Sequence, residues 1–444
     1  MTIRSWFLTC SSDPHSYTLD DTTIPVKKRP LQSPKLFASD TSSCSEIGSN
    51  SSTPSQETSC SSLESNLSLQ TLPSVLSLQQ SLSPETLNDV SISHLCLSSF
   101  NPQNRQITCL AVSGNILYVA SGNEINVFDL TNYTQIDSFN DTKSGSGSVK
   151  SITFSTGKIF TAHQDCKIRV WQITENKQHK LIATLPTLKD RVRRSVLPKN
   201  YVRVRRHKKQ LWIQHSDAVS GLSVKNDLIY SVSWDKCLKI WRSKDLLCLE
   251  SIKAHEDAVN AITVSIDGTV YTASADKRIR VWGRGFNEKK HSLIAALEKH
   301  KSAVNALALS DDGSVLFSGA CDRSILVWEK EDSAQYMSVT GALRGHSGAI
   351  LCLINVSGLL VSGSADRTVR VWQRRGDGQH YCCLAVMEGH ERPVKSLVAV
   401  SNGVSDGAVT VCSGSLDGEV KVWQILVSNL KSSSPSSDLI KWNF

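Results

Sequence analysis

The sequence has no apolar run of the roughly 18 residues that a membrane-spanning helix needs. The first residues, MTIRSWFLTCSSDPHS, lack the apolar core of a secretory signal and the Met-Gly start needed for myristoylation. The 13 cysteines are an odd number, and none forms a C-x-x-C pair. Several, such as Cys109, Cys237 and Cys352, fall within apolar strand patterns. We therefore expect buried thiols in a reducing compartment, the cytoplasm or nucleus, rather than disulfides or a zinc site.

Motifs typical of enzymes are also missing. No Walker loop, Rossmann fingerprint, H-E-x-x-H or G-x-S-x-G sequence is present. The hydrophobic content is 40% and the aromatic content 6%, which is ordinary for a soluble globular protein with a disordered part. We therefore expect a non-enzymatic protein with no catalytic residues, cofactor or metal.

Positive charge is concentrated in one segment. Residues 180–212 contain eleven Lys and Arg against a single acidic residue, Asp190, a balance of +10. The formal net charge of the whole chain is +8, so the basic character belongs to this segment.

The two ends of the chain are polar. Residues 41–80 contain 14 serines, too little apolar surface to offset the entropy of ordering, and we expect residues 1–88 to be a disordered leader. Lys27-Lys28-Arg29-Pro30 is a nuclear-import candidate, and Ser33, Thr53 and Ser83 each precede a proline as candidates for phosphorylation. Residues 429–444 are expected to be a loose tail.

An internal repeat is more informative than any local motif, because it determines the architecture of the chain. In the stretch Ser231–Trp241, a hydroxyl residue lies four residues before Asp235 and a Trp six residues after it, which reads as strand, turn and strand. The phrase occurs six times, as Thr161…Asp165…Trp171, Ser231…Asp235…Trp241, Thr272…Asp276…Trp282, Ser318…Asp322…Trp328, Ser362…Asp366…Trp372 and Ser413…Asp417…Trp423, with a degenerate copy that ends at Phe128. After an insertion of roughly 28 residues is removed, the spacing is about 40–45 residues, the period of four-stranded blades.

Five repeats also carry a His four residues before the opening strand, as in Gly345-His346 and Gly389-His390. With these motifs, residues 90–428 resemble the WD-repeat β-propellers. The resemblance implies an all-β fold with seven blades, over about residues 89–428. It also implies that a strand at Ser91–Ser98 completes the last blade beside Val420–Trp423. One departure is that no repeat ends in Trp-Asp.

In the resembled family, the His, Ser or Thr, Asp and Trp form a buried hydrogen-bonded chain that fixes each blade. These are also residue types of acyl-transfer chemistry. Because the constellation recurs five times and catalysis needs one site, we interpret it as framework. The five predicted structural tetrads are His215/Ser231/Asp235/Trp241, His255/Thr272/Asp276/Trp282, His300/Ser318/Asp322/Trp328, His346/Ser362/Asp366/Trp372 and His390/Ser413/Asp417/Trp423. Two blades deviate, with Gly122 where the Asp should be and Gly145 where the His should be.

Partner-binding candidates follow from the family by position, at the narrow mouth of the ring. Trp234, just before a turn Asp, is a favoured hot-spot type, and its alternative role is packing against a neighbouring blade. Lys150, Asn260, Asn305 and Lys395 each follow the first apolar residue of an opening strand. Such a flat, weakly polar face suits a protein or peptide rather than a small molecule.

The basic insertion, about residues 187–210, is the individual feature of this chain. Thr187–Asp190 resembles a capping box, Leu188, Val192 and Val196 fall on one helical face, and residues 201–205 alternate like a strand. If residues 180–186 form the outer strand of their blade, the insertion lies on the top face near Trp234, which we favour. If residues 210–214 form that strand, the insertion hangs from the bottom.

The insertion has two functional readings and a structural one. Arg203, Arg205 and Arg206 are candidates for binding an acidic partner or nucleic acid, although nucleic acid is the less favoured of the two. The structural alternative is a solvated loop that caps the blade. Few aromatic residues interleave the charges, which gives little support for base stacking.

The phrases Leu185–Asp190 and Leu197–Tyr201 are similar to those of the plant WD-repeat group that includes JINGUBANG, which implies a regulatory protein of plant cells. We therefore expect a monomeric scaffold or adaptor that binds proteins or peptides, possibly acidic ones. One rival is a substrate receptor of a cullin-type ubiquitin ligase, for which Trp372-Gln-Arg-Arg375 is the nearest match to Trp-Asp-x-Arg and lacks the Asp. The other rival is nucleic-acid binding through the insertion.

Overall fold

The computed structural model describes residues 90–102, 105–140, 145–285, 288, 290–330, 337–375, 380–401 and 408–429. These residues all belong to one compact unit, residues 69–444. The predicted disordered leader, its nuclear-import and phosphorylation candidates, and the tail beyond residue 429 lie outside the described residues. Within them, neither helix has the length and apolar character that crossing a bilayer requires.

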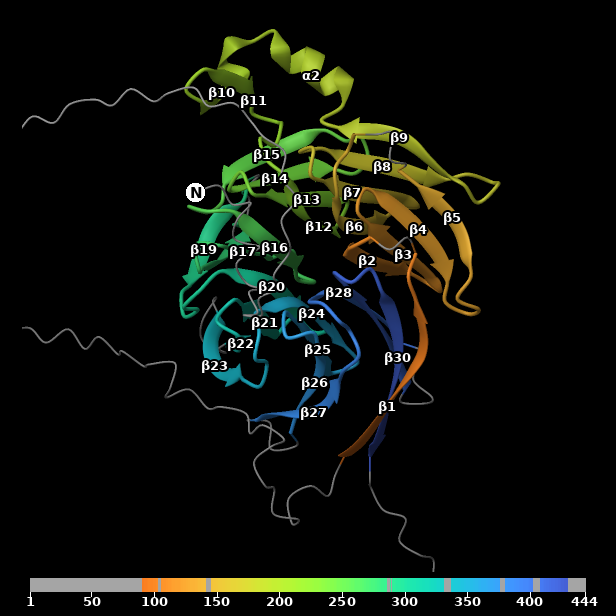
Figure 1. Cartoon of the computed structure of the whole chain (residues 1–444). Helices are drawn as coiled ribbons and strands as arrows, with labels where there is room; N and C mark the ends of the chain where they lie inside the picture. The colour runs from red at the N-terminus through yellow and green to blue at the C-terminus, as the bar shows by residue number, and fades with distance from the viewer. Residues whose placement is uncertain are drawn as a thin grey trace, which may run out of the picture. The chain divides into compact units, whose positions relative to one another are not determined.

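Seven four-stranded antiparallel sheets are arranged around a common axis (Figure 1). Blade 1 comprises β2 (Ile107–Ser113), β3 (Ile116–Ser121), β4 (Glu124–Asp129) and β5 (Gln135–Phe139). Blade 2 comprises β6 (Val149–Ser155), β7 (Lys158–His163), β8 (Ile168–Ile173) and β9 (His179–Leu185). Blade 3 comprises β12 (Val219–Lys225), β13 (Leu228–Ser233), β14 (Cys237–Arg242) and β15 (Cys248–Lys253). Blade 4 comprises β16 (Val259–Val264), β17 (Val270–Ser274), β18 (Ile279–Gly283) and β19 (Ser292–Leu297).

Blade 5 comprises β20 (Val304–Leu309), β21 (Val315–Ala320), β22 (Ile325–Lys330) and β23 (Met337–Leu343). Blade 6 comprises β24 (Ile350–Val356), β25 (Leu359–Ser364), β26 (Val369–Arg374) and β27 (Tyr381–Met387). Blade 7 comprises β28 (Val394–Ser401), β29 (Ala408–Ser415), β30 (Val420–Asn429) and β1 (Val90–Phe100). The predicted seven-bladed all-β fold is thus confirmed.

The core lies between adjacent blades. Middle strands such as β21 are buried along their whole length because both faces of each sheet are covered by a neighbouring blade. Phe317 of blade 5, for example, packs in one cluster with Ile350 and Trp372 of blade 6. The innermost strands contact one another around the whole ring, including β28 with β2. Stability is therefore shared between neighbouring blades rather than held within each one.

Blade 7 is built from both ends of the described chain, as the resemblance to the WD-repeat propellers implied. Strand β1 pairs antiparallel with β30, so that Cys96 faces Trp423 and Phe100 faces Val420. Figure 1 shows the two strands side by side, β1 in orange and β30 in blue. This pairing completes the blade with hydrogen bonds between segments about 330 residues apart in sequence and protects the edge of β30.

The basic insertion connects β9 to β12. Because β9 is the outer strand of blade 2, the first of the two predicted arrangements is correct. The insertion contains helix α2 (Leu188–Ser195), the short 3₁₀ helix η4 (Pro198–Asn200) and a hairpin of β10 (Tyr201–Arg205) with β11 (Lys208–Leu211). The hydroxyl of Thr187 accepts a hydrogen bond from the Asp190 N–H, which confirms the predicted helix start. The second strand of the hairpin was not predicted.

The position of the insertion corrects one expectation. In a four-stranded meander, the connection from the outer strand to the next blade leaves from the same edge as the turn between the two middle strands. The insertion therefore begins on the side of the ring that carries Trp234, as expected. It then packs against blade 3, where Arg194 Nη2 donates to the carbonyl of Cys248 in β15 at 3.1 Å. Figure 1 shows α2 at the outer rim of the ring rather than over its mouth.

Candidate functional site

Each of blades 3 to 7 contains a chain of hydrogen bonds through the four residues that the repeat predicted. The His Nδ1 lies 2.7–3.3 Å from an Asp oxygen, and its Nε2 lies 2.8–2.9 Å from the Ser or Thr hydroxyl. The Trp indole N–H donates to the same hydroxyl at 2.8–2.9 Å. The turn Asp also accepts backbone N–H groups, as Asp235 does from Ser216 and Cys237.

The direction of these hydrogen bonds follows from their chemistry. The indole can only donate and the ionised carboxylate can only accept, so the hydroxyl donates to His Nε2 and His Nδ1 donates to the Asp. That arrangement requires a neutral imidazole. Burial lowers the pKa of His215, His346 and His390, which keeps the ring neutral, while the neighbouring Asp opposes the shift. For Asp276 and Asp322, burial favours protonation but is outweighed by the hydrogen bonds that each carboxylate accepts from the His and from backbone N–H groups, and the pKa falls to about 2.

The same connectivity, Asp to His Nδ1 and His Nε2 to a hydroxyl, occurs in hydrolase triads. Here the five hydroxyl residues are fully buried, at 0% exposure. Each hydroxyl oxygen also accepts the indole N–H, so a substrate has no route to it. The arrangement is suited to joining the strands of a blade to the loop that enters it.

Blade 2 contains a substitute that the sequence analysis missed. Gly145 occupies the place of the usual His, but His163 at the end of β7 approaches the hydroxyl of Thr161 with its Nε2 at 2.7 Å. The Trp171 indole donates to the same hydroxyl at 2.9 Å, while Asp165 pairs with Arg169 instead of a His. The signal was present, because a His stands two residues after Thr161 where the other copies have Ser or Ala, at Ser233, Ser274, Ala320, Ser364 and Ser415.

His163 is fully buried, and its Nδ1 has no hydrogen-bond partner among the described residues. Burial, followed by the nearby charge of Arg169, lowers its pKa to about 3. It is therefore neutral throughout the physiological range.

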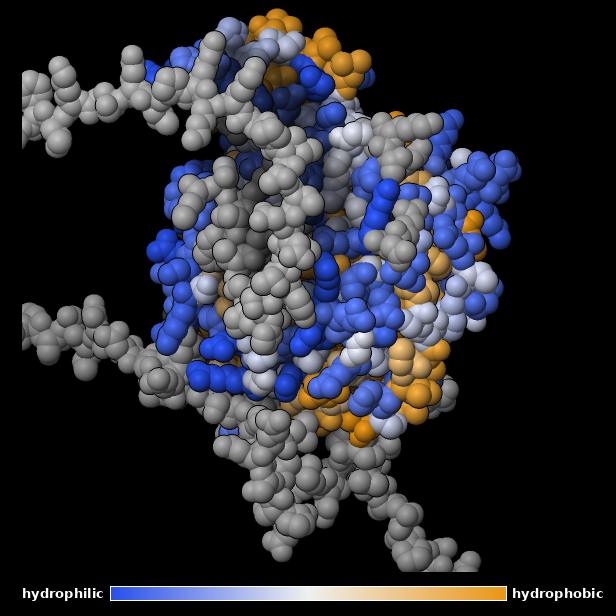
Figure 2. Space-filling model, viewed as in Figure 1, coloured by the Kyte–Doolittle hydropathy of each residue, from blue (hydrophilic) through white to orange (hydrophobic). Residues whose placement is uncertain are grey.

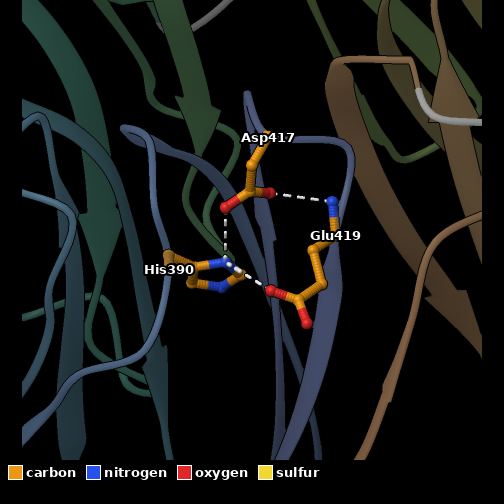
Figure 3. A group of neighbouring side chains, drawn as sticks. All are labelled: His390, Asp417 and Glu419. Atoms are coloured by element: carbon orange, nitrogen blue, oxygen red, sulfur yellow. Dashed lines mark hydrogen bonds and ion pairs between the residues drawn. The ribbon is translucent and has the colours of Figure 1, made fainter.

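Blade 7 adds a carboxylate to its tetrad. Figure 3 shows Glu419 beside His390 and Asp417, and these are the residues within the described part of the chain whose spacing could suit a metal ion. Their ligand atoms are already engaged. Glu419 forms an ion pair with Lys421 at 3.0 Å and accepts the Ser99 hydroxyl from β1, while Asp417 accepts the Glu419 and Glu391 N–H groups. The group is better explained as an extension of the framework to the closing strand β1.

Two of the predicted partner-binding residues come together at the mouth of the ring. The Lys150 ammonium lies 5.6 Å from the centre of the Trp234 ring, which joins the opening strand of blade 2 to a turn of blade 3. Both side chains are half-buried. Burial, followed by repulsion from Lys395, lowers the pKa of Lys150 to about 8. We call the mouth cluster the pair of Lys150 and Trp234 together with Lys395, whose charge acts on Lys150.

The two asparagines have a different environment. The Asn260 amide donates to the Val304 carbonyl at 3.0 Å, and the Asn305 amide donates to the Ile350 carbonyl at 2.9 Å. Each contact links one blade to the opening strand of the next. Because these amides are used inside the ring, their positions favour a role in joining blades over a role in binding partners.

The predicted arginines of the insertion are on its surface. Arg203 and Arg206 are exposed, and Arg205 pairs through its backbone with Lys208 in the hairpin. Arg194, by contrast, forms the internal contact of the insertion. It binds the buried Asp190 at 2.7 Å and stacks over Trp212 at 4.6 Å.

Comparison with known proteins agrees with this architecture. The family model described as "WD domain, G-beta repeat" matches residues 207–242, 246–283, 291–329, 337–373 and 381–424. The human apoptotic protease-activating factor 1 is 25% identical over 201 residues, which is 42% of this chain and 16% of that protein. The chain thus spans only a small part of the length of this relative.

The matched repeats coincide with the blades that carry the complete tetrad, blades 3 to 7. Four of the five matched repeats begin at the outer strand of one blade and end on the third strand of the next, so the unit of sequence links two blades; the first begins at His207, within the insertion. WD40 propellers are a family that is typically non-catalytic and that generally serves protein interaction. Residues 207–424 are thus WD40 repeats, and the ring to which they belong is a seven-bladed β-propeller.

Proposed function

We propose that this protein is a non-catalytic interaction scaffold that binds a partner protein at the mouth cluster. The observation that carries the proposal is the contact of Lys150 with Trp234 across two blades. A half-buried Trp beside a cation supplies apolar area and charge in one place, the combination typical of binding hot spots. The other blades have small residues or Gln and Leu where Trp234 stands, so the feature is confined to one sector of the mouth.

The charges of the mouth cluster favour an acidic segment of the partner. Burial lowers the pKa of both Lys150 and Lys395, and the charge of Lys395 lowers the pKa of Lys150 further. A carboxylate between them would relieve this repulsion. Protonation of Lys150 would then favour binding, and we expect affinity to fall as the pH rises through about 8, the pKa of Lys150. A Lys150→Arg variant, which stays charged, should lose less affinity than the wild type as the pH rises through that value.

The test is recovery of partners with the wild-type chain and Trp234→Ala. We expect the variant to lose a specific set of partner proteins while its melting temperature stays unchanged. Ile266→Ala is the matched control, because Ile266 is an exposed apolar residue at 62% exposure in a turn on the opposite edge of the ring. Equal recovery by Trp234→Ala and wild type, or loss of partners by the Ile266 variant as well, would contradict the proposal.

A regulatory role in plant cells is a finer proposal, supported by the likeness of Leu185–Asp190 and Leu197–Tyr201 to the JINGUBANG group. The role of a ubiquitin-ligase receptor has less support, since Gln373 stands where that motif carries an Asp. The likeness to apoptotic protease-activating factor 1 supports the shared repeats and supplies no partner.

A further inference from the structure

We propose that the insertion is a second docking surface, which binds an acidic amphipathic helix of a partner protein. The surface consists of Leu188, Val192 and Val196, which we call the insertion ridge, with the basic residues around it. It lies on the outer side of blades 2 and 3, away from Trp234, so the proposal goes beyond the mouth cluster and stands or falls separately from it.

Helix α2 is inverted relative to an ordinary surface helix. A helix on the surface of a globular domain normally turns its apolar face inward. In α2 the inward face is polar, since Asp190 is 1% exposed and binds Arg194, which also reaches the Cys248 carbonyl. The apolar residues point outward instead, with Leu188 at 74%, Val192 at 60% and Val196 at 76% exposure. Figure 2 shows this group as orange side chains over α2.

The apolar area extends to the hairpin. The Tyr201 hydroxyl donates to the Ser195 carbonyl at 3.4 Å, and the Asn200 amide donates to the Arg194 carbonyl at 2.8 Å. These bonds hold the start of β10 against the end of α2. Tyr201, at 40% exposure, is thus kept near the insertion ridge. A set of apolar side chains that is both exposed and held in place marks a binding surface.

The charges beside the ridge define the partner. Lys189, Arg191 and Arg193 alternate with the apolar residues along α2 and are exposed, and Lys199 and Arg203 follow. Asp190, the acidic residue of the helix, forms an ion pair with Arg194. A second copy of this surface would meet like charges and be repelled, whereas an acidic surface would be attracted.

The spacing and residue types favour a protein helix over a membrane or a nucleic acid. Leu188, Val192 and Val196 follow at intervals of four residues, the ridge that fits the groove between the ridges of another helix. Membrane-surface helices favour Trp and Phe beside Leu on the apolar face, and α2 has Leu188 but neither aromatic residue. Trp212, which could stack on a base, is covered by Arg194. An acidic amphipathic helix satisfies both the apolar ridge and the cations.

The test measures binding of a fluorescent synthetic helix to the full chain by anisotropy. The probe has about 18 residues, with Leu on one face at helical spacing and Glu at the flanks, and a scrambled peptide of the same composition is its control. We expect the helical probe to bind at least about tenfold more tightly than the scrambled one. Val192→Asn should weaken binding by a similar factor with an unchanged melting temperature, and Ile266→Asn, on the opposite edge, should leave it unchanged.

Equal binding of both peptides would mean that the surface recognises only the charge of the peptide, and it would overturn the proposal. So would full binding by Val192→Asn, or tighter binding of phosphatidylserine vesicles or single-stranded RNA than of the helical probe. Trp234→Ala separates the two proposals, because it should abolish recovery of mouth partners and leave the helical probe bound.

Discussion

At the scale of single residues, the fold depends on chains of hydrogen bonds in which every donor points the same way. In each complete tetrad the indole, hydroxyl and imidazole each donate one proton to the next group, and the line ends on a carboxylate. Every member is therefore either fully satisfied or, when its neighbour is removed, left buried with an unmet hydrogen bond. Because removal of the Asp leaves a buried imidazole without its acceptor, we expect stability to be sensitive to substitution of this last residue of the hydrogen-bonded chain.

We expect Asp366→Ala to lower the free energy of unfolding by about 1–3 kcal/mol. Asp366 accepts His346 Nδ1 at 2.7 Å and the Ser347 N–H at 2.9 Å, and the variant leaves His346 buried without its partner. Equilibrium denaturation in urea measures the change. Loss of one partner protein with an unchanged unfolding free energy would show that Asp366 serves binding rather than the frame.

His163 predicts an acid dependence of stability. Its pKa of about 3 in the folded chain lies below the 6.5 of an unperturbed His, so between these values the unfolded chain binds a proton that the folded chain does not. Stability is complete above pH 6.5 and falls with decreasing pH, by about 1.4 kcal/mol per unit for one such group. His163→Gln should reduce the slope measured between pH 6.5 and 5. An unchanged slope would place the proton uptake elsewhere.

At the scale of elements, the insertion is attached by a polar contact where a core contact would be usual. Asp190 and Arg194 form the side of α2 that faces the propeller, and the Arg194 guanidinium also stacks on Trp212 and reaches β15. Because one side chain makes three contacts, the attachment of the helix depends strongly on it. The exposed apolar residues of α2 contribute little to that attachment.

We expect Arg194→Ala to loosen the insertion and leave the ring folded. Amide hydrogen exchange should quicken across residues 188–205, and the loss of stability, about 1–3 kcal/mol, should reflect the buried Asp190 left without its partner. Arg193→Ala is the matched control, since Arg193 is exposed on the same helix. Equal exchange in the two variants would mean that other contacts hold the insertion.

At the scale of the whole molecule, the ring depends on β1. The outer edge of β30 is paired along Val90–Phe100, and Ser99 of β1 donates to Glu419 beside the blade 7 tetrad. Phe100 also packs on Phe128 of blade 1, with ring centres 4.6 Å apart. The strand therefore joins the last blade to the first.

A chain that begins at Asn101 should be less stable than one that begins at Asp89 and should aggregate, because it exposes the edge of β30. Thermal unfolding and light scattering of the two truncated chains measure the difference. Similar melting and scattering would mean that β1 is dispensable for closure.

Much of this architecture was predictable because the repeat consists of a few residue types at fixed spacing. Ser231–Trp241 and its copies establish the resemblance to the WD-repeat propellers, and that resemblance implies the tetrads, the seven blades and the closing strand. His163 was missed because it reaches the hydroxyl from within its own strand, whereas the repeat supplies its His from the preceding loop. The partnership of Lys150 with Trp234 depends on how neighbouring blades meet, which spacing along one chain does not define. Likewise, the pattern at Leu188, Val192 and Val196 gives an apolar face but not the direction in which it points.

The pairing of β1 with β30 also determines when the ring can close during synthesis of the chain. The strand at Val90–Phe100 is made before any other strand of the ring, yet its partner is about 330 residues later in the chain. A growing chain therefore carries a finished strand with no sheet to join until the last blade emerges. Contacts so distant in sequence form slowly, and the waiting strand is open to wrong pairing. Completion of the ring should thus be the last and slowest step of folding, and the one that a chaperone has most reason to protect.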